Sequence, residues 1–396
     1  MSGKNTSIKI SKSLLCKVAK LYKVNEKQRP FVASSTYKTL APFLLGQILC
    51  QEKAKKKLVG WPIAKLFFTS IALEQSTPMK VAQQKAATIY ALSTQKPSTI
   101  YSLTGGLGVD DVCLSNYFDK VISIDTNSFL NDIARYNFNE LGIHNIQRQT
   151  VSAEEFIAIN NIKNSLFYID PDRRAETNHN NKNVSSFAPN IFKIIPELIK
   201  KCNHIFVKLS GATDITWIEK HLQPSQIYVF SLNKEVKEIL VVIDGKYKKS
   251  NISFISISSK NTFECKESEL ITLNNMTSTT PTSHILKLDG LFTKSLYLRN
   301  NLKPISKNTF FYFCKSKNAS DFGKLLSVIW SFDGSFKQLE NKLKNEKILH
   351  SSVLTRNWKL NSNQTKNKLN LLESNEYQLL IFGEGNKIKA FFCKFK

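Results

Sequence analysis

The chain has 396 residues, of which 42% are hydrophobic and 11% aromatic, so it can bury the cores of two or three domains and is not a disordered chain. Its 56 Lys and Arg against 31 Asp and Glu give a formal charge of +25, which favours nucleic acid as a partner; a lysine-biased coding background would give the same excess. No apolar run approaches the roughly 18–20 residues that span a bilayer, and no apolar segment follows the N-terminal lysines. We therefore expect a cytoplasmic protein without a membrane partner.

The seven cysteines are scattered singly, with no C-x-x-C pair and no nearby histidine at zinc-ligand spacing. Structural zinc sites need their ligands in such clusters. The sequence therefore predicts reduced, mostly buried thiols and no metal.

Residues 1–92 have a helical pattern. Apolar residues recur at helical spacing over residues 39–58, and a second helix is predicted over residues 78–92. The first helix ends in a lysine cluster, which either complements the helix dipole as a solvated basic end or contacts phosphates, with a nearby tryptophan able to stack on a base. The candidate nucleic-acid residues in this region are Lys53, Lys55, Lys56, Lys57 and Trp61.

From about residue 97 to 245, β-prone and helix-prone segments alternate, a pattern typical of a parallel sheet with helices on both faces. Strands are predicted at residues 99–103, 121–124, 147–151, 166–169, 205–209, 227–231 and 239–243. Only a short link joins the last two, so they should form a hairpin that makes one strand antiparallel. The sequence thus predicts a Rossmann-like α/β domain with seven strands, differing at one edge from a dinucleotide-binding sheet.

A glycine-rich turn follows the first of these strands. Gly105, Gly106 and Gly108 lie within four positions in a chain with only 14 glycines, which indicates a strained turn or a close backbone approach to a ligand. Asp125 ends the next strand 20 positions after Gly105, where a carboxylate can bind a ribose diol. A dinucleotide fingerprint would need glycine at the position of Asp111, so a pyrophosphate cofactor is disfavoured. A tight turn without a ligand is the alternative.

Asp170 and Pro171 end the fourth predicted strand, at the sheet edge where α/β domains bind ligands. Proline makes the turn rigid, so the carboxylate can orient or deprotonate a nucleophile. Arg173 and Arg174 follow and could clamp a phosphate or carboxylate. The alternative is a structural Asp-Pro turn with surface arginines.

The remaining sequence differs in composition. Residues 246–283 are rich in Ser, Lys, Asn and Thr, and residues 274–283 are predicted to be a linker. Strands at residues 309–313, 379–382 and 389–394 and helices at residues 336–344 and 365–371 predict a small C-terminal α+β module.

The chain resembles the class I S-adenosylmethionine-dependent methyltransferases, and more narrowly a bacterial family with a C-terminal THUMP-like domain. Its residues match family elements along nearly the whole chain: Q-x-K-A-K-x-K-L-x-x-W at residues 51–61, S-x-E-Q-S at 72–76, D-L-T-G-G-x-G-V-D at 102–110, D-P-x-R-R at 170–174 and L-T-R-N-[FW] at 354–358. Two of these elements differ from the family at their first residue: Ala72 replaces a serine, and Ser102 replaces an acid.

The resemblance implies four parts: a helical region (1–92), a Rossmann-like methyltransferase domain (93–280), a small ferredoxin-like or linking segment (281–323) and a THUMP-like domain (324–396). It implies S-adenosyl-L-methionine as cofactor and RNA, either tRNA or rRNA, as partner, with Arg356 added to the nucleic-acid candidates. The implied cofactor residues are Thr104, Gly105, Gly106, Gly108, Asp125, Ser152, Ala153 and Asp170, and the implied catalytic residues are Asp170, Pro171 and Arg173.

Three functions compete. The favoured one is an S-adenosylmethionine-dependent RNA methyltransferase that modifies a base nitrogen in preference to a ribose oxygen, since no cysteine near Asp170 supports a covalent route to a pyrimidine carbon. The alternative is an RNA-binding protein with a degenerate, weakly active or inactive methyltransferase domain, because Ser102 replaces the acid of the glycine turn. A nicotinamide-dependent oxidoreductase is disfavoured by Asp111 and by the predicted hairpin.

Overall fold

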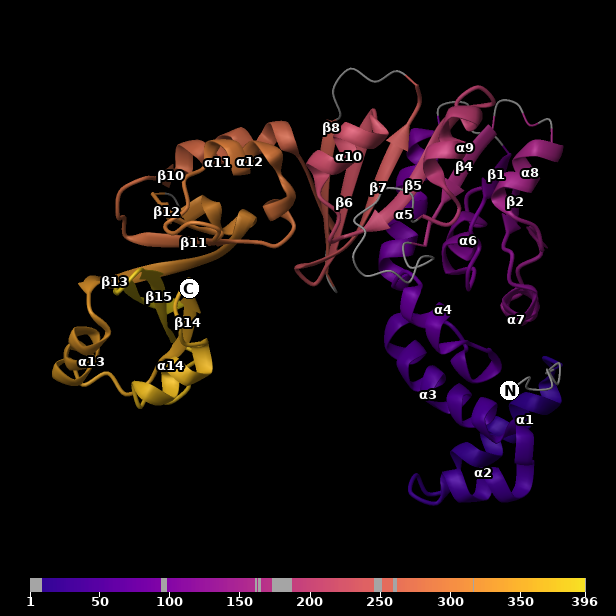
Figure 1. The fold of residues 1–396 in the computed structure, drawn as a ribbon, viewed down its shortest axis with the longest axis horizontal. Coiled ribbons are helices and arrows are strands. Elements are labelled where there is room, and N and C mark those ends of the chain that lie inside the picture. Colours follow the sequence, from indigo (N-terminus) through magenta and orange to yellow (C-terminus); the bar gives the residue numbers. More distant parts are fainter. Residues whose placement is uncertain are drawn as a thin grey trace. The chain divides into compact units, whose positions relative to one another are not determined.

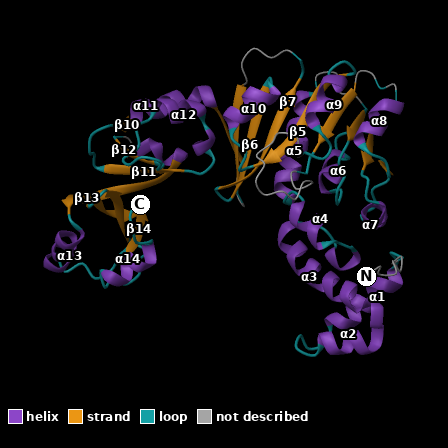
Figure 2. Cartoon of the chain, in the orientation of Figure 1, coloured by secondary structure: helices purple, strands orange, loops and turns teal. Residues whose placement is uncertain are grey.

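The computed structural model describes residues 9–93, 98–160, 162, 165–172, 187–245, 251–258, 262–315 and 317–395. The chain divides into two compact units, one of residues 1–251 and 257–261 and one of residues 252–256 and 262–396. Figure 1 shows the fold coloured along the sequence, and Figure 2 shows its helices and strands. Helices dominate up to residue 92, and the strands that follow form two sheets.

The N-terminal region contains the helices α1 (Lys12–Tyr22), α2 (Arg29–Tyr37), α3 (Ala41–Lys57), α4 (Ser70–Gln75) and α5 (Met79–Leu92). Helices α3 and α5 confirm the two predicted helices. Proline near the start of α3 suits the first helical turn, whose N–H groups have no intrahelical acceptor. Leu44 and Ile48 of α3 are fully buried, one helical turn apart, so one face of α3 packs into the core.

The strands of the first unit are β1 (Thr99–Ser102), β2 (Lys120–Ile124), β3 (Ile146–Gln149), β4 (Ser165–Ile169), β5 (Cys202–Ser210), β6 (Gln226–Leu232) and β7 (Glu235–Ile243). Strands β1 to β5 are parallel to one another, whereas β7 is antiparallel to both β5 and β6. The seven predicted strands and the hairpin are therefore confirmed. Two further strands, β8 (Asn251–Ile257) and β9 (Thr262–Lys266), give nine strands in the order β3-β2-β1-β4-β5-β7-β6-β8-β9.

The helices that alternate with these strands are α6 (Val109–Leu114), α7 (Ser128–Glu140), α8 (Ala153–Ile159), α9 (Ile191–Leu198) and α10 (Ile215–Leu222). The strand order reverses between β1 and β4, because the chain first builds outward to β3 and then starts again beside β1. Open α/β sheets bind ligands at the carboxyl ends of the strands beside such a reversal. The fold therefore places the glycine turn and Asp170 at the expected binding edge.

Two side-chain amides tie the segment before α4 to neighbouring helices. Asn137 of α7 donates to the carbonyl oxygen of Phe67 at 2.8 Å and accepts from its N–H at 3.0 Å. Gln47 of α3 makes the equivalent pair with Phe68, at 2.6 and 2.9 Å. Both phenylalanines are fully buried, so these amides satisfy backbone groups that water cannot reach.

We predict that Asn137→Ala lowers the free energy of unfolding by about 2–4 kcal/mol, because it leaves a buried N–H and a buried carbonyl of Phe67 without partners. Denaturant unfolding of both proteins measures the difference. Asn139→Ala, an exposed asparagine of the same helix, should change stability by less than about 0.5 kcal/mol. Equal effects of the two substitutions would contradict this account.

The second unit is built on a sheet in the order β10-β12-β11-β13-β16-β15-β14. Its strands are β10 (Thr277–Ser278), β11 (His284–Leu288), β12 (Phe311–Cys314), β13 (Gly323–Gly334), β14 (Ser352–Arg356), β15 (Tyr377–Glu384) and β16 (Lys387–Phe395). Its helices are α11 (Ile271–Met276), α12 (Leu296–Asn301), α13 (Phe336–Asn345) and α14 (Ser362–Lys368). Leu379 and Ile381 of β15 pack in one hydrophobic cluster and Leu380 and Phe382 in another, so both faces of the sheet are covered.

The linker prediction for residues 274–283 is wrong for the first half, residues 274–278. This segment holds the end of α11 and the strand β10, which pairs with β12. Polar composition misled the prediction, because a two-residue strand at a sheet edge needs backbone pairing and few apolar side chains. Within the described ranges, none of the helices combines the length and hydropathy needed to cross a membrane.

Candidate functional site

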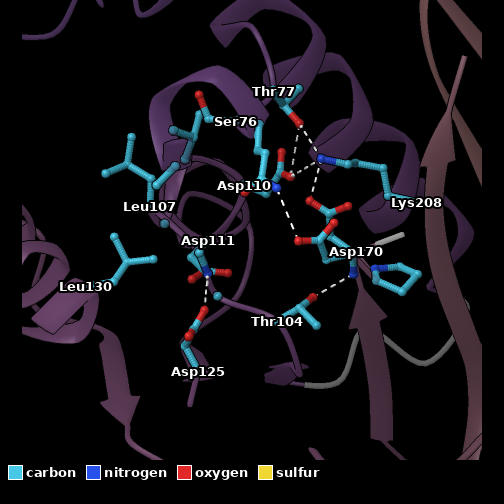
Figure 3. A pocket seen from close by; sticks show the side chains of 18 of the residues that line it. Ser76, Thr77, Thr104, Leu107, Asp110, Asp111, Asp125, Leu130, Asp170 and Lys208 are labelled. Carbon is cyan, nitrogen blue, oxygen red and sulfur yellow. Dashed lines mark hydrogen bonds and ion pairs between the residues drawn. The ribbon is translucent and has the colours of Figure 1, made fainter. Parts of the chain in front are cut away.

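A cleft of about 1650 Å³ lies at the carboxyl ends of β1 to β5 in the first unit. The loops after β1, β2, β3 and β4, the end of β5, and α4 with the residues that follow it line this cleft. Figure 3 shows Leu107 and Leu130 on the side of Asp125, and Thr77 and Lys208 on the side of Asp170. The cleft therefore has two ends with different chemistry.

Each of the three glycines in the turn occupies a position that disfavours a larger residue. Gly106 and Gly108 have φ of +50° and +84°, in the left-handed region that favours glycine. A Cβ on Gly108 would meet the ring of Phe138 at 2.5 Å, and one on Gly105 would overlap the guanidinium of Arg148. The turn thus lies directly against a buried arginine.

Arg148, from β3, holds the glycine turn from below with a fully buried side chain. Its Nη2 donates to the carbonyl oxygen of Gly106 at 2.5 Å, its Nε donates to Asn131 Oδ1 at 2.6 Å, and its Nη1 lies 3.2 Å from Asp111 Oδ2. Ser123 also donates to Asp111, at 2.5 Å. Burial raises the pKa of Asp111, with Arg148 and Ser123 acting in the opposite direction.

Ser102 is fully buried at the end of β1 and is not among the residues that line the cleft. Serine in place of an acid at this position therefore changes the buried residues beneath the glycine turn and not the lining of the cleft. A carboxylate is still present beneath the turn, because Asp111 of α6 is buried there and paired with Arg148. Asp111, the residue that breaks the dinucleotide fingerprint, thus has a structural role in the turn.

We predict unequal costs for alanine at two adjacent glycines. Gly105→Ala should lower the free energy of unfolding by about 2–3 kcal/mol or more, because its methyl group would displace Arg148 from a close-packed layer. Gly106→Ala should cost only about 1 kcal/mol, since nothing lies within 4 Å of its Cβ position and only the left-handed backbone opposes it. Denaturant unfolding of the two variants checks this, and the opposite ranking would refute it.

Asp125, directly after β2, lies where a ribose-binding carboxylate was predicted. Its Oδ2 accepts from the N–H of Gly106 and its Oδ1 from the N–H of Asn127, both at 2.9 Å. Each carboxylate oxygen has a second lone pair, so the side chain can still accept from a ligand. Ser152 and Ala153 also line the cleft, and Ser152 caps α8 by accepting from the N–H of Glu155.

Asp170 lies at the other end of the cleft and is fixed from two sides. Its backbone N–H donates to Thr104 Oγ1 at 2.6 Å, and its Oδ2 lies 2.5 Å from Lys208 Nζ of β5. Burial raises the pKa of Asp170, and the Lys208 ammonium offsets part of this effect. For Lys208, burial opposes the charge, but Asp170 and Glu238 raise its pKa overall.

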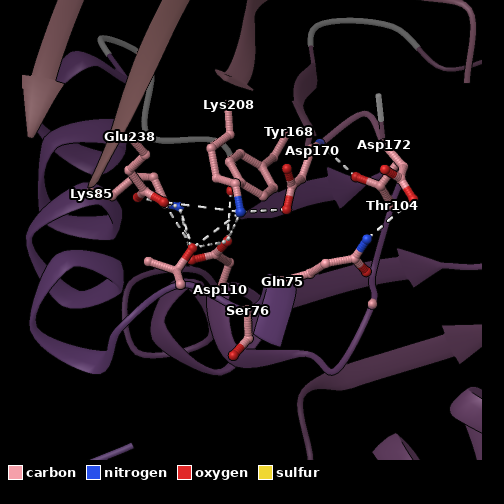
Figure 4. Close-up of polar contacts among 12 residues, drawn as sticks. Gln75, Ser76, Lys85, Thr104, Asp110, Tyr168, Asp170, Asp172, Lys208 and Glu238 are labelled. Atoms are coloured by element: carbon pink, nitrogen blue, oxygen red, sulfur yellow. Dashed lines mark hydrogen bonds and ion pairs between the residues drawn. The ribbon is translucent and has the colours of Figure 1, made fainter. Parts of the chain in front are cut away.

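Lys208 belongs to a buried cluster of charged groups (Figure 4). Lys85 Nζ of α5 lies 3.0 Å from Asp110 Oδ1 and 2.7 Å from Glu238 Oε1. Thr77 Oγ1 is within 3.2 Å of both carboxylates, and Tyr168 donates to Asp110 at 2.7 Å. Burial alone would raise the pKa of Asp110, but Lys85 and Lys208 lower it overall.

The sequence prediction did not include Lys85, Arg148, Lys208 or Glu238. For Lys208, a lysine inside an otherwise apolar strand segment was the available signal, because such a charge needs a buried partner. Lys208 sits in β5 between Val207 and Leu209, which are both buried. Its partner is 38 positions away, so the sequence could not name it.

The other predicted catalytic residues have different positions. Pro171 lines the cleft beside Asp170. Asp172 follows, and Gln75 of α4 donates to its Oδ2 at 3.2 Å, which links the α4 wall to the end of β4. Arg173 lies outside the described residues, so its predicted role stays a prediction.

The nucleic-acid candidates are split between the two units. Lys53 and Lys55 are exposed on α3, and Lys56 and Lys57 line the cleft. Trp61 packs against a hydrophobic cluster that includes Val112 and Phe138, so part of its ring is taken up by core packing. Arg356 is exposed at the end of β14 in the second unit. Their predicted contacts with RNA remain predictions.

Lys57 is a half-buried amine at the cleft wall. Its Nζ donates to the carbonyl oxygens of Leu73 and Glu74, both at 2.7 Å, at the end of α4. Burial, together with repulsion from Lys208, lowers the pKa of Lys57 to about 8. A substantial fraction of this amine is therefore neutral just above physiological pH.

We predict that one lysine side-chain resonance titrates with a midpoint near pH 8, and that it is missing in Lys57→Arg. NMR of protein with ¹³Cε-labelled lysine measures this midpoint. The folded-state pKa lies below the ordinary 10.5, so below pH 8 the folded state bears the full cost of burying the ammonium. This cost falls between pH 8 and 10.5. The stability of the wild type relative to Lys57→Met should rise with pH over that window, and a constant difference would contradict the lowered pKa.

No protein-family model matches the chain, and a search of curated proteins finds no match. Among solved structures, a candidate methyltransferase from Porphyromonas gingivalis W83 is 18% identical, with a TM-score of 0.77 over 98% of this chain and 100% of that one. A candidate RNA methyltransferase from Pyrococcus horikoshii is 14% identical, with a TM-score of 0.33 over 48% of this chain and 95% of that one. The first likeness shows a shared fold along nearly the whole chain: a Rossmann-like methyltransferase sheet with helices before it and a second sheet after it.

Proposed function

We propose that this protein transfers a methyl group from S-adenosylmethionine to RNA. The observation that carries the proposal is the cleft, in which the glycine turn and Asp125 form one end and Asp170 the other. Ligand sites of about 300–1,000 Å³ are common, so about 1650 Å³ leaves room for a cofactor and part of a substrate. The fold shared with the Porphyromonas protein supports the same reaction class.

The residues present fit such a cofactor. Asp125 keeps free lone pairs for ribose hydroxyls, and the glycine backbone at Gly105 and Gly106 lets a ligand approach closely. Leu107 and Leu130 lie on the same side and suit an apolar adenine face. Ser152 also lines the cleft and would bind the polar edge of the adenine. This cofactor supplies a methyl group already activated by its sulfonium, so the protein's task is mainly to bind and orient the reactants.

An RNA substrate is supported by charge. The chain carries +25 overall, and Lys56 and Lys57 line the cleft at the end of α3, where they could contact phosphates. We extend the proposal to the second unit, in which Arg356 and neighbouring lysines would bind tRNA or rRNA as a THUMP-like module.

The competing function is RNA binding by a domain that no longer methylates. The replaced acid at Ser102 suggested this alternative. Its burial beneath the turn, with Asp111 nearby, favours a turn that still binds the cofactor. The two functions differ in one measurable property, the affinity for S-adenosylmethionine.

We predict that isothermal titration calorimetry detects binding of S-adenosylmethionine, and that Asp125→Ala weakens it about 10- to 100-fold, since hydrogen bonds to a charged group contribute about 1.5–3 kcal/mol. Asp132→Ala is the matched control, because Asp132 is an exposed acid of the following helix, pairs with Arg135 and does not line the cleft. It should bind as the wild type does. Absence of binding heat in the wild type, with RNA binding retained, would select the degenerate domain.

A further inference from the structure

The ammonium of Lys208 bears on which atom accepts the methyl group. A neutral base nitrogen gains positive charge as it attacks a sulfonium methyl, whereas a hydroxyl must lose its proton and develops negative charge on oxygen. An enzyme stabilises a transition state by placing the opposite charge where charge develops. A fixed cation beside the nucleophile therefore favours oxygen and disfavours a neutral nitrogen.

Lys208 is such a fixed cation. Its Nζ lies 2.5 Å from Asp170 Oδ2 and 3.2 Å from Thr77 Oγ1, and its side chain is 9% exposed while lining the cleft. Asp170 is itself held by the hydrogen bond from its N–H to Thr104. An acceptor that hydrogen-bonds to Oδ2 of Asp170 would therefore lie close to the ammonium (Figures 3 and 4).

The surrounding cluster can also take up a proton. It contains two ammonium groups, Lys85 and Lys208, and three carboxylates, Asp110, Asp170 and Glu238. With all five ionised, the cluster has one uncompensated negative charge, and uptake of one proton makes it neutral. Asp170 is the member whose side chain is most open to the cleft, with 33% of its surface exposed against 13% for Asp110 and 5% for Glu238.

We propose that the methyl acceptor is a hydroxyl oxygen of RNA, the ribose 2′-hydroxyl, and that Asp170 and Lys208 activate it together. This inference rests on the proposed function. The oxygen forms a bond to the methyl carbon, the carbon–sulfur bond breaks with its electron pair going to sulfur, and the hydroxyl proton passes to Asp170 and then to water. Lys208 stabilises the negative charge that develops on the oxygen.

The inference departs from the base nitrogen expected from the sequence. That expectation used the lack of a cysteine near Asp170, which argues against a covalent route to a pyrimidine carbon. The lack of a cysteine does not separate nitrogen from oxygen. The position of Lys208 does, because the two acceptors develop opposite charges.

Alkaline hydrolysis tests the acceptor directly. RNA from cells lacking the protein is incubated with it and with S-adenosylmethionine carrying a radioactive methyl group, and the RNA is then hydrolysed in alkali. A 2′-O-methyl group removes the nucleophile that cleaves the adjacent phosphodiester, so we expect the label in alkali-stable dinucleotides. Label in mononucleotides would place the methyl group on a base and overturn this inference while leaving RNA methylation intact. No label in RNA, despite cofactor binding, would refute the proposed function and the inference with it.

Substitution of Lys208 tests its part in the reaction. Lys208→Met should lower the transfer rate about 100-fold or more, while Lys208→Arg, which keeps a cation, should retain more of it. Affinity for S-adenosylmethionine should stay within about threefold for both variants, which separates a chemical role from loss of folding. Lys201→Met is the control, because Lys201 precedes the opposite end of β5 and donates to the carbonyl oxygen of Ile157, outside the cleft. Faster or unchanged transfer by Lys208→Met would contradict the role of the cation.

Discussion

The ion pair between Arg148 and Asp111 is the interaction on which the cleft depends. It lies beneath the glycine turn with both side chains at most 2% exposed, and the guanidinium also binds the carbonyl oxygen of Gly106. Because the guanidinium occupies the space where a Cβ of residue 105 would lie, the pair fixes glycine at that position. Breaking such a buried pair by removing one partner leaves an uncompensated charge. The shape of the turn and the position of Asp125 beside it therefore depend on a buried ion pair directly beneath the turn.

The second buried network, around Lys85 and Lys208, shapes the opposite end of the cleft. It joins Lys85 of α5, Lys208 of β5, Glu238 of β7 and Asp170, which follows β4. Each of these charged groups is paired with at least one group of opposite charge. The two networks differ in their access to the cleft. Arg148 is shielded by the turn, so its charge supports structure, whereas Lys208 reaches the lining, where its charge can act on a substrate.

The sequence predicted most of the fold, because most strands of the first sheet are apolar runs and each of β1 to β5 is followed by a helix. It also predicted that Gly105, Asp125 and Asp170 lie at the same edge of the sheet, since all three follow strands whose carboxyl ends share that edge, and all three line the cleft. The partners of Arg148 and Lys208 could not be predicted, because ion pairs between distant positions depend on packing in three dimensions. The linker prediction failed at β10 because a short edge strand is held by backbone pairing, and such a strand can have a polar composition.

The chain as a whole has an excess of positive charge, whereas the charged cluster in the cleft has an excess of negative charge. Lysines on α3 and elsewhere give the chain its excess of positive charge, which attracts a polyanion without regard to sequence. Inside the cleft, the cluster of Asp110, Asp170 and Glu238 with two lysines has one more negative than positive group. For the proposed reaction, this excess of negative charge would repel a phosphate from the cleft floor, whereas it would not oppose the approach of an uncharged ribose hydroxyl to Asp170.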